Sequence, residues 1–195
     1  MKVYELTFGK GDSVDAVSLV EMPAIEEEAV FLKTDTTKIK LSLDTEKREI
    51  IGAALVPNKP IFRKGNPEDY YIYFSKDTVQ SAMNDFMQPN KKNNFTLEHE
   101  SSTSEVVAME SWIVKGEEDK ANTLYNLDAP EGSWILRTHV PNKEYWNSVI
   151  KEGNFNGYSI EAKLGNKIAR QELSDNVLDY LVDGIKEVLT NYYNN

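Results

Sequence analysis

The segment NFNGYSIEAK, residues 154–163, places a serine between two apolar neighbours in a stretch whose composition predicts a short β-strand. An Asn-Gly pair precedes it, as expected of a turn. Ser159 is therefore either an ordinary strand residue or a nucleophile presented at a strand end. GYSIE differs from the GxSxG nucleophile elbow because Glu161 stands where that motif has glycine, and no helical pattern follows. The segment does not indicate an α/β-hydrolase.

Similar short segments recur over the first two thirds of the chain. They are rich in Val, Ile, Leu or aromatic residues and are separated by Gly, Pro, Asp or Thr, which is typical of β-strands and turns. The segments that predict strands are 2–8, 15–22, 28–33, 38–44, 49–57, 70–74, 94–100, 105–115, 133–140 and 154–163.

Helical periodicity interrupts this β pattern in three places. Residues 75–88 bring apolar side chains onto one face at helical spacing, and residues 142–153 follow a proline and end at a glycine. Residues 174–192 predict a C-terminal amphipathic helix whose apolar stripe needs a partner surface. Residues 115–132 are polar and turn-rich, which predicts a mobile surface loop.

Composition narrows the class of protein. We expect residues 1–195 to form a single domain that buries about two thirds of the surface of the unfolded chain. The absence of cysteine excludes thiol catalysis and disulfide frameworks. The net charge of −10 and the dispersed basic residues argue against a nucleic-acid partner. No signal peptide or membrane-spanning stretch is recognisable, so we expect no membrane partner and a soluble protein with protein partners.

Two histidines are the natural candidates for a general base. In a strand over residues 94–100, Phe95, Leu97 and His99 would alternate onto one face, where a partly apolar environment favours the neutral imidazole that a base requires. The alternative is a packed or hydrogen-bonded structural histidine. His139 precedes a proline-containing turn and is interpreted as structural.

Other catalytic chemistries find less support. The two histidines lie far apart without an HxxxH pair, so a zinc site is not indicated. A carboxylate pair of the glycosidase type is possible in so acidic a chain, but nothing distinguishes two of the 32 acidic residues.

Three motifs, FTLEHE (95–100), VVAMESWIVK (106–115) and NGYSIEA (156–162), follow one another in the order found in a known group of enzymes. Together they resemble the prohead (capsid maturation) serine proteases of tailed phages, which carry LxHE, a SWIV strand and GxSIE. The resemblance covers most of residues 3–165, and Ser159 follows His99 by 60 positions, an ordinary separation for that group. It implies an α+β fold similar to herpesvirus assemblin, a closed and mainly antiparallel β-barrel with surrounding helices.

The resemblance assigns Ser159 as nucleophile and His99 as general base, within about 3 Å of each other. An acid should accept a hydrogen bond from the second ring nitrogen of the base. In many prohead proteases a segment after the serine supplies it, whereas here the similar segment DAVSLVEMPA (15–24) stands at the start. We infer a circular permutation that makes Asp15 the orienting acid, with Glu110 and Glu100 as alternatives.

The turn at residues 163–167, or Arg170 beyond it, is the candidate source of oxyanion stabilisation. For Asp15, Glu110 and Glu100, the structural alternative is that all three are simply solvated charges on strands.

The implied function is a serine endopeptidase that cleaves phage scaffold and major capsid proteins in the host cytoplasm, inside the immature prohead. No cofactor or metal is expected. Related enzymes trim themselves and tend to cut after acidic residues, so 23–29 and 170–174 are candidate self-processing sites. A homo-oligomer is a further expectation from the C-terminal stripe. The alternative function is a non-enzymatic phage head or scaffold component that retains the protease fold.

Overall fold

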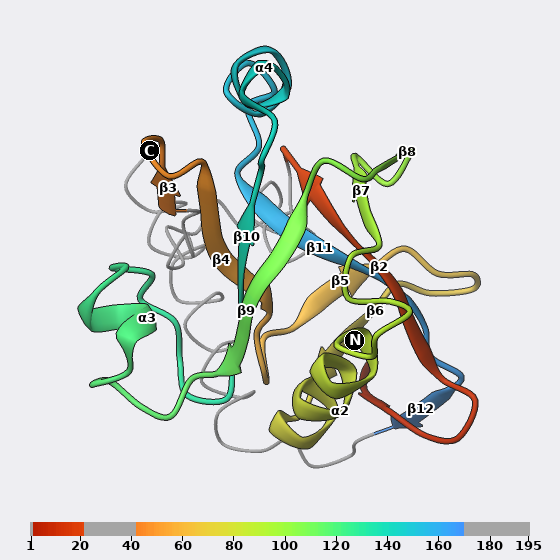
Figure 1. Cartoon of the computed structure of the whole chain (residues 1–195). Helices are drawn as coiled ribbons and strands as arrows, with labels where there is room; N and C mark the ends of the chain where they lie inside the picture. The colour runs from red at the N-terminus through yellow and green to blue at the C-terminus, as the bar shows by residue number, and fades with distance from the viewer. Residues whose placement is uncertain (1, 22–41, 170–195) are drawn as a thin grey trace, which may run out of the picture.

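The structure is a computed structural model that describes residues 2–21 and 42–169. Its strands and short helices form a mixed α+β arrangement (Figure 1). The described strands form three sheets of four strands each. The predicted α+β class is confirmed, and closure into a barrel stays a prediction.

Each sheet combines segments that are distant in the chain. The first, with the order β12-β1-β6-β5, contains β1 (Lys2–Thr7), β5 (Ile61–Arg63), β6 (Tyr70–Phe74) and β12 (Asn166–Ala169). The second, with the order β3-β4-β10-β9, contains β3 (Ser42–Asp44), β4 (Glu49–Leu55), β9 (Val107–Ile113) and β10 (Trp134–His139). The third, with the order β11-β2-β7-β8, contains β2 (Ser13–Val20), β7 (Phe95–Leu97), β8 (Ser101–Thr103) and β11 (Gly157–Lys163).

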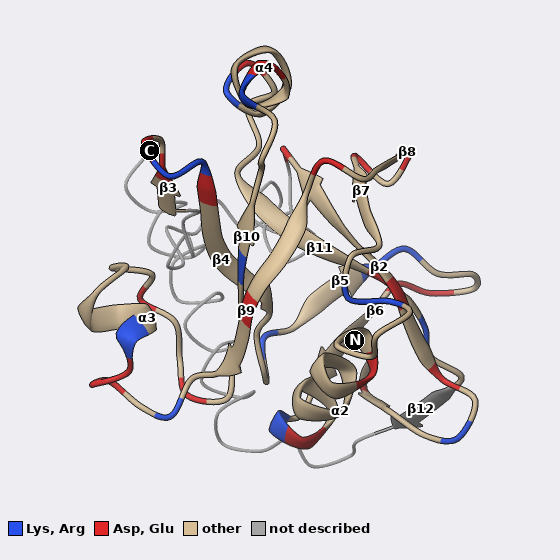
Figure 2. Cartoon of the chain, in the orientation of Figure 1, with Lys and Arg blue, Asp and Glu red and all other residues tan. Residues whose placement is uncertain are grey.

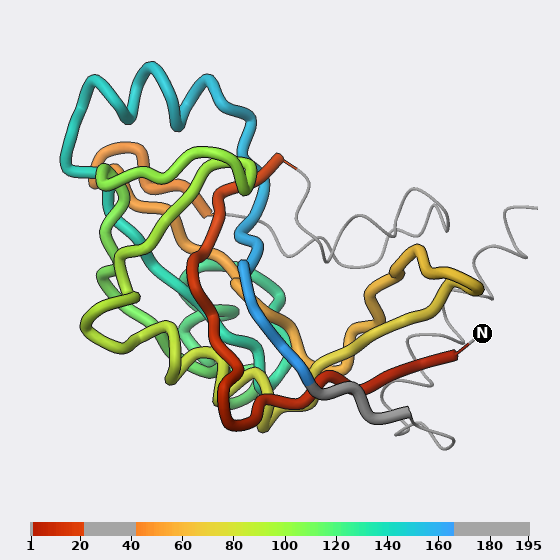
Figure 3. Tube along the Cα trace, turned by 90° about the vertical axis from the view of Figure 1, so that its right-hand side faces the viewer, coloured from red at the N-terminus to blue at the C-terminus, as the bar shows by residue number. Residues whose placement is uncertain are grey.

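The third sheet is organised around β2. This strand pairs antiparallel with β11, where Ser18 lies opposite Ser159, and parallel with β7, where Ser18 lies beside Thr96. The two views in Figures 1 and 3 both show β2 and β11 running side by side. Because side chains alternate along a strand, these three polar residues share one face of the sheet. The other face carries the apolar residues of the same strands.

The helices α2 (Lys76–Phe86), α3 (Lys120–Thr123) and α4 (Lys143–Tyr145), with the π-helix η1 (Trp146–Ile150), connect the strands. Val79, Ala82 and Phe86 of α2 are buried at helical spacing, which confirms the predicted apolar face. The Phe86 ring packs 5.6 Å from the Trp134 ring of β10 and 5.8 Å from the Phe95 ring of β7, measured between centroids. These aromatic contacts join the second and third sheets across a shared core.

Tyr158 ties β11 to the second sheet. Its hydroxyl donates a hydrogen bond to the Ile50 carbonyl of β4 at 3.1 Å. Its oxygen lies 2.7 Å from the Thr138 hydroxyl of β10, which is the donor because the tyrosine proton is already used. Burial raises the pKa of the Tyr158 phenol, although the Thr138 hydrogen bond opposes the change. The neutral phenol thus fixes the position of the residue next to Ser159.

Most predicted strands that fall within the described residues are confirmed, with bounds that differ by at most three positions. The short strands β5, β8 and β12 were not predicted, since three or four residues are too few for a clear alternating pattern. The helix predicted over 142–153 is present as α4 followed by η1. The predicted strand 28–33 and helix 174–192 lie outside the described residues.

Two sequence predictions are wrong in their local structure. The strand predicted over residues 94–100 ends at Leu97, because Glu98 and His99 adopt positive φ angles of 51° and 59°. The stretch 115–132 contains the helix α3, whose N-terminus the Asp119 carboxylate caps by accepting a hydrogen bond from Ala121 N at 2.9 Å. Leu127 in the same stretch is 1% exposed, so this segment packs on the core.

Among the helices at residues 2–21 and 42–169, none combines the length and apolarity required to cross a membrane.

We predict that Tyr158→Phe lowers the free energy of unfolding by about 1–3 kcal/mol. The substitution keeps the ring but leaves the Thr138 hydroxyl, which is fully buried, without its partner. Urea unfolding followed by circular dichroism measures the change. Tyr145→Phe on α4 is the matched control, because the Tyr145 hydroxyl makes no hydrogen bond within the described residues, and it should change the stability by less than about 0.5 kcal/mol. Equal losses for both variants would contradict the anchoring role.

Candidate active site

Ser159 is the third residue of β11 and lies on the opposite face from Tyr158. It is 7% exposed and directly opposite Ser18 of β2. Its hydroxyl makes no hydrogen bond with any residue in the described part of the chain. The hydroxyl is therefore available to an incoming group.

His99 lies in the tight turn that joins β7 to β8. The Glu100 N–H donates a hydrogen bond to the Leu97 carbonyl at 3.0 Å, and the two central residues, Glu98 and His99, both have positive φ. Turns of this kind favour Asn-Gly, whereas a side-chain-bearing residue in the left-handed region costs roughly 1–2 kcal/mol. Backbone strain of this kind often accompanies functional sites, where the surrounding contacts maintain it.

Ser18 provides the contact that holds this turn. Its hydroxyl accepts a hydrogen bond from the backbone N–H of His99 at 2.9 Å and lies 3.3 Å from the Leu19 carbonyl. The Glu98 N–H also donates to the Leu19 carbonyl, at 2.9 Å. Ser159 and His99 therefore flank the same residue of β2, and with adjacent strands about 4.8 Å apart their backbones lie roughly 10 Å from each other.

The imidazole of His99 contacts the Glu161 side chain of β11, which reaches across β2 to β7. Its Nδ1 lies 3.1 Å from Oε1 of Glu161, and the Thr96 hydroxyl donates a short hydrogen bond to the same oxygen. Glu161 follows Ser159 by two positions, so both side chains lie on one face of β11. A carboxylate at Nδ1 favours the tautomer in which Nδ1 carries the proton and Nε2 is free to act as a base. The face predicted for His99, shared with Phe95 and Leu97, is therefore wrong.

Glu161 is not among the acids that the sequence predicts to orient the base. The feature of the sequence that points to Glu161 is the alternation in GYSIE, which places its side chain on the same face of the strand as Ser159. That alternation alone could not identify its partner. The contact also depends on the left-handed turn at Glu98 and His99, after which the imidazole lies beside the Thr96–Glu161 hydrogen bond.

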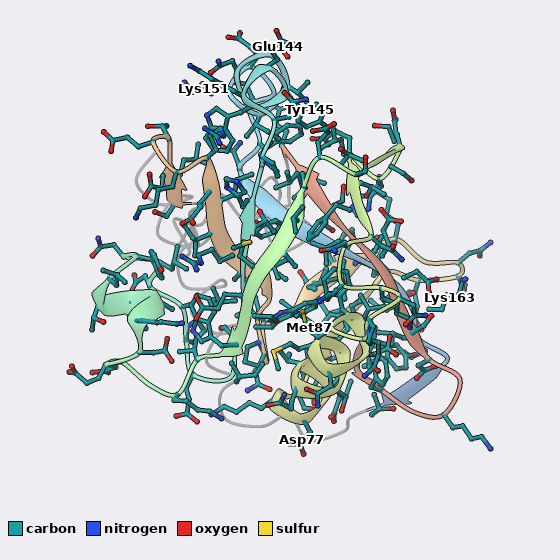
Figure 4. The ribbon with its side chains drawn as sticks, in the orientation of Figure 1. Asp77, Met87, Glu144, Tyr145, Lys151 and Lys163 are labelled. Carbon is teal, nitrogen blue, oxygen red and sulfur yellow. The ribbon has the colours of Figure 1, made fainter. Side chains whose placement is uncertain are left out.

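Asp15, the acid predicted from the resemblance, has other partners. Its carboxylate accepts a hydrogen bond from the Ser13 hydroxyl at 2.7 Å and forms an ion pair with Lys163 at 2.9 Å. These hydrogen bonds, that of Lys163 first, lower the pKa of Asp15. Figure 4 labels Lys163 beside β2. The strand of Asp15 does pair with the strand of Ser159, but within the described residues no hydrogen bond or ion pair joins its carboxylate to His99, and its catalytic role stays a prediction.

The remaining candidates lie in different surroundings. Glu110 of β9 forms ion pairs with Lys120 and with Arg137 Nε, the latter at 3.3 Å. It therefore belongs to an ion-pair network at the second sheet. Glu100 follows His99 in the turn and is exposed. His139 ends β10, in a different sheet from His99.

The region predicted to stabilise an oxyanion is described only in part. The Gly165 N–H donates a hydrogen bond to Asp12 at 2.9 Å, so this turn is tied to the turn between β1 and β2. Arg170 lies outside the described residues, and its role stays a prediction.

A pocket of about 650 Å³ adjoins the His99–Glu161 pair. Glu161 lines it together with Thr96, the residue that donates to its carboxylate. The rest of the lining comes from β2, from the start of β7 and the two residues before it, and from β8 and the residue after it: Asp15, Ala16, Asn93, Asn94, Phe95, Ser102, Thr103 and Ser104. Within residues 2–21 and 42–169, no group of three or more His, Asp and Glu side chains is arranged to hold a metal ion.

Comparison with known families gives one match. The family model described as "Putative phage serine protease XkdF" matches residues 36–168, which is more than half of the chain. The matched span includes His99, Ser159 and Glu161 and does not include Asp15. Comparisons with curated proteins and with solved structures found no match.

We predict that Glu161→Gln shifts neutral His99 from the Nδ1–H toward the Nε2–H tautomer, because the carboxylate that accepts from Nδ1 is gone. Long-range ¹⁵N–¹H NMR spectra of the ring nitrogens, recorded at alkaline pH where imidazole is neutral, measure the two populations. Asp15→Asn is the control and should leave them unchanged. A shift in Asp15→Asn without one in Glu161→Gln would contradict the assignment of Glu161 as the partner.

Proposed function

The chain belongs to this family of phage serine proteases, and we propose that it is an endopeptidase with Ser159 as nucleophile, His99 as general base and Glu161 as the acid that orients the base. The observation that carries the proposal is the His99–Glu161 contact of 3.1 Å beside a serine hydroxyl that has no other partner within the described residues. These three groups are the parts that acyl transfer by a serine requires.

The reaction begins when Nε2 of His99 removes the proton of the Ser159 hydroxyl as its oxygen attacks the peptide carbonyl carbon. The imidazolium then donates this proton to the nitrogen of the leaving amine, and the peptide bond breaks to leave an acyl-enzyme. Water, deprotonated by the same nitrogen, attacks the ester carbonyl. The new carboxyl terminus leaves and Ser159 recovers its proton.

Glu161 acts through His99 in both halves of this cycle. Its carboxylate holds the proton on Nδ1, which leaves the lone pair on Nε2, and it stabilises the imidazolium when that forms. The Thr96 hydrogen bond to Oε1 restricts the carboxylate to one orientation. The base must approach the serine oxygen to within about 3 Å, and the exposed His99 ring, with 42% of its side chain accessible, has room to turn toward it.

The biological setting is part of the same proposal. The resemblance to prohead proteases supports substrates among phage scaffold and major capsid proteins, cleavage inside the immature prohead, and self-processing. It also supports an assemblin-like closed barrel. Both candidate self-processing segments, 23–29 and 170–174, lie outside the described residues.

We predict that Ser159→Ala lowers peptide-bond cleavage by about 10³-fold or more and leaves the fold intact. Co-expression with the scaffold and capsid proteins of the same phage, followed by mass mapping of the products, measures cleavage. Labelling with a serine-reactive phosphonate should place the adduct on Ser159. Ser148→Ala, an exposed serine on η1, is the matched control. A processing pattern that is the same in wild type and Ser159→Ala would instead favour the non-enzymatic head or scaffold component.

Substitution of the two competing acids separates their roles. We predict that Glu161→Gln lowers turnover by up to about 10⁴-fold through the wrong tautomer of His99, and that Asp15→Asn has a much smaller effect. Turnover numbers on one cleaved peptide provide the comparison. If Asp15→Asn is the slower enzyme, the acid predicted from the permuted segment is the orienting residue and Glu161 is not.

A further inference from the structure

The pocket beside Glu161 has a floor of short side chains on the catalytic face of the third sheet. Ala16 of β2 lies opposite Glu161 of β11, and Thr96 of β7 lies opposite Ser102 of β8, so all four point to the same side. The methyl group of Ala16 leaves space between the longer side chains. The pocket volume of about 650 Å³ is ample for one long amino-acid side chain.

The lining of this pocket is a mixture of polar and apolar groups, and its charged side chains are acidic. It contains the carboxylates of Asp15 and Glu161, hydroxyl groups and two asparagine amides, and no lysine or arginine. Lys163 pairs with Asp15 from outside the lining, and 81% of its side chain is exposed. A salt bridge this exposed is screened by water and leaves the Asp15 carboxylate open to further partners.

Glu161 retains acceptor capacity that the catalytic arrangement does not use. His99 and Thr96 both bind Oε1, and within the described residues Oε2 has no hydrogen-bond partner. A carboxylate offers about four acceptor sites, so Oε2 can accept from a donor in the pocket. A cationic donor would form the stronger, charge-assisted hydrogen bond.

The charge around the pocket is mixed, because Lys91 and Lys163 lie near Asp15 and acidic residues lie at the β7–β8 turn. The β7–β8 turn carries the exposed residues Glu98 and Glu100, and Figure 2 shows acidic residues in red at this end of the hairpin. An acidic side chain in the pocket would meet two carboxylates without a cation in the lining. A lysine or arginine side chain would meet acceptors of opposite charge.

We propose that this pocket is a substrate subsite that takes a lysine or arginine side chain of the cleaved polypeptide. The proposal rests on the proposed function of Ser159 and adds its specificity. It differs from the preference for acidic residues that the resemblance implies. Glu161 lines the pocket and also contacts His99. A side chain bound in the pocket is therefore separated from the catalytic base only by Glu161.

The test is a change of charge on β8. Ser102→Lys places an ammonium group in the pocket, whereas Ser101→Lys places it one position earlier, on a residue outside the lining. Both serines are exposed, so both variants should fold, which circular dichroism checks. Cleavage sites in a proteome-derived peptide pool are mapped for wild type, both variants and Ser159→Ala.

We expect wild type and Ser101→Lys to favour Lys and Arg by about tenfold or more at one fixed position relative to the cleaved bond. Ser102→Lys should lose this preference and gain one for Glu and Asp. A Ser159-dependent cleavage without enrichment of basic residues, or with enrichment that Ser102→Lys leaves unchanged, would overturn the subsite.

A binding measurement keeps the subsite testable when no cleavage is found. N-acetyl-lysine methylamide, added to the Ser159→Ala chain, should shift the backbone amide NMR signals of Ala16 and residues 102–104, and the glutamate analogue should not. Absence of Ser159-dependent cleavage counts against the proposed function. Absence of the lysine-induced shifts counts against the pocket, whatever the cleavage result.

Discussion

The register of β2 between β11 and β7 is the constraint on which the site depends. Ser18 pairs with Ser159 on one side and with Thr96 on the other, and its hydroxyl holds the backbone N–H of His99 at 2.9 Å. A slip by one residue would turn Ser18 into the core and bring Leu19 or Val17 to the polar face. The nearly continuous burial of β2 opposes such a slip, because both neighbouring apolar residues would lose their buried contacts.

Successive residues after Gly157 point to opposite faces of the third sheet. Tyr158 anchors the strand through hydrogen bonds to Ile50 and Thr138, while Ser159 and Glu161 point to the other face. The positions of Ser159 and Glu161 on the polar face thus depend on the hydrogen bonds of Tyr158 in the core behind them. A buried phenol with two partners allows little movement of the strand, so the serine beside it is held in place before any substrate binds.

The strain in the β7–β8 turn has a structural consequence. A residue in a regular strand could aim its side chain only above or below the sheet at its own position. The left-handed conformation of His99 releases it from that alternation, and its ring meets the Glu161 carboxylate, which reaches across β2 to Thr96. Under the proposed function, one carboxylate then connects the general base to the substrate pocket. The conformational cost is offset by the hydrogen bonds that Ser18 and Leu19 provide to the turn.

Local sequence patterns indicated most of the longer strands and the apolar face of α2, because alternation and helical spacing are properties of neighbouring residues. The rarity of histidine made His99 a candidate, and the resemblance of three motifs selected Ser159 as its partner. Tertiary structure decided the partner of His99. Glu161 lies 62 residues away in sequence, and their contact requires both a turn with positive φ and an intervening strand of fixed register. Tertiary structure also paired Asp15 with Lys163. The register of β2 with β11 shifts between Glu161 and Ala162, and this shift sets the position of the Asp15 carboxylate relative to Lys163. Such relations depend on how distant strands align, and no single segment contains that information.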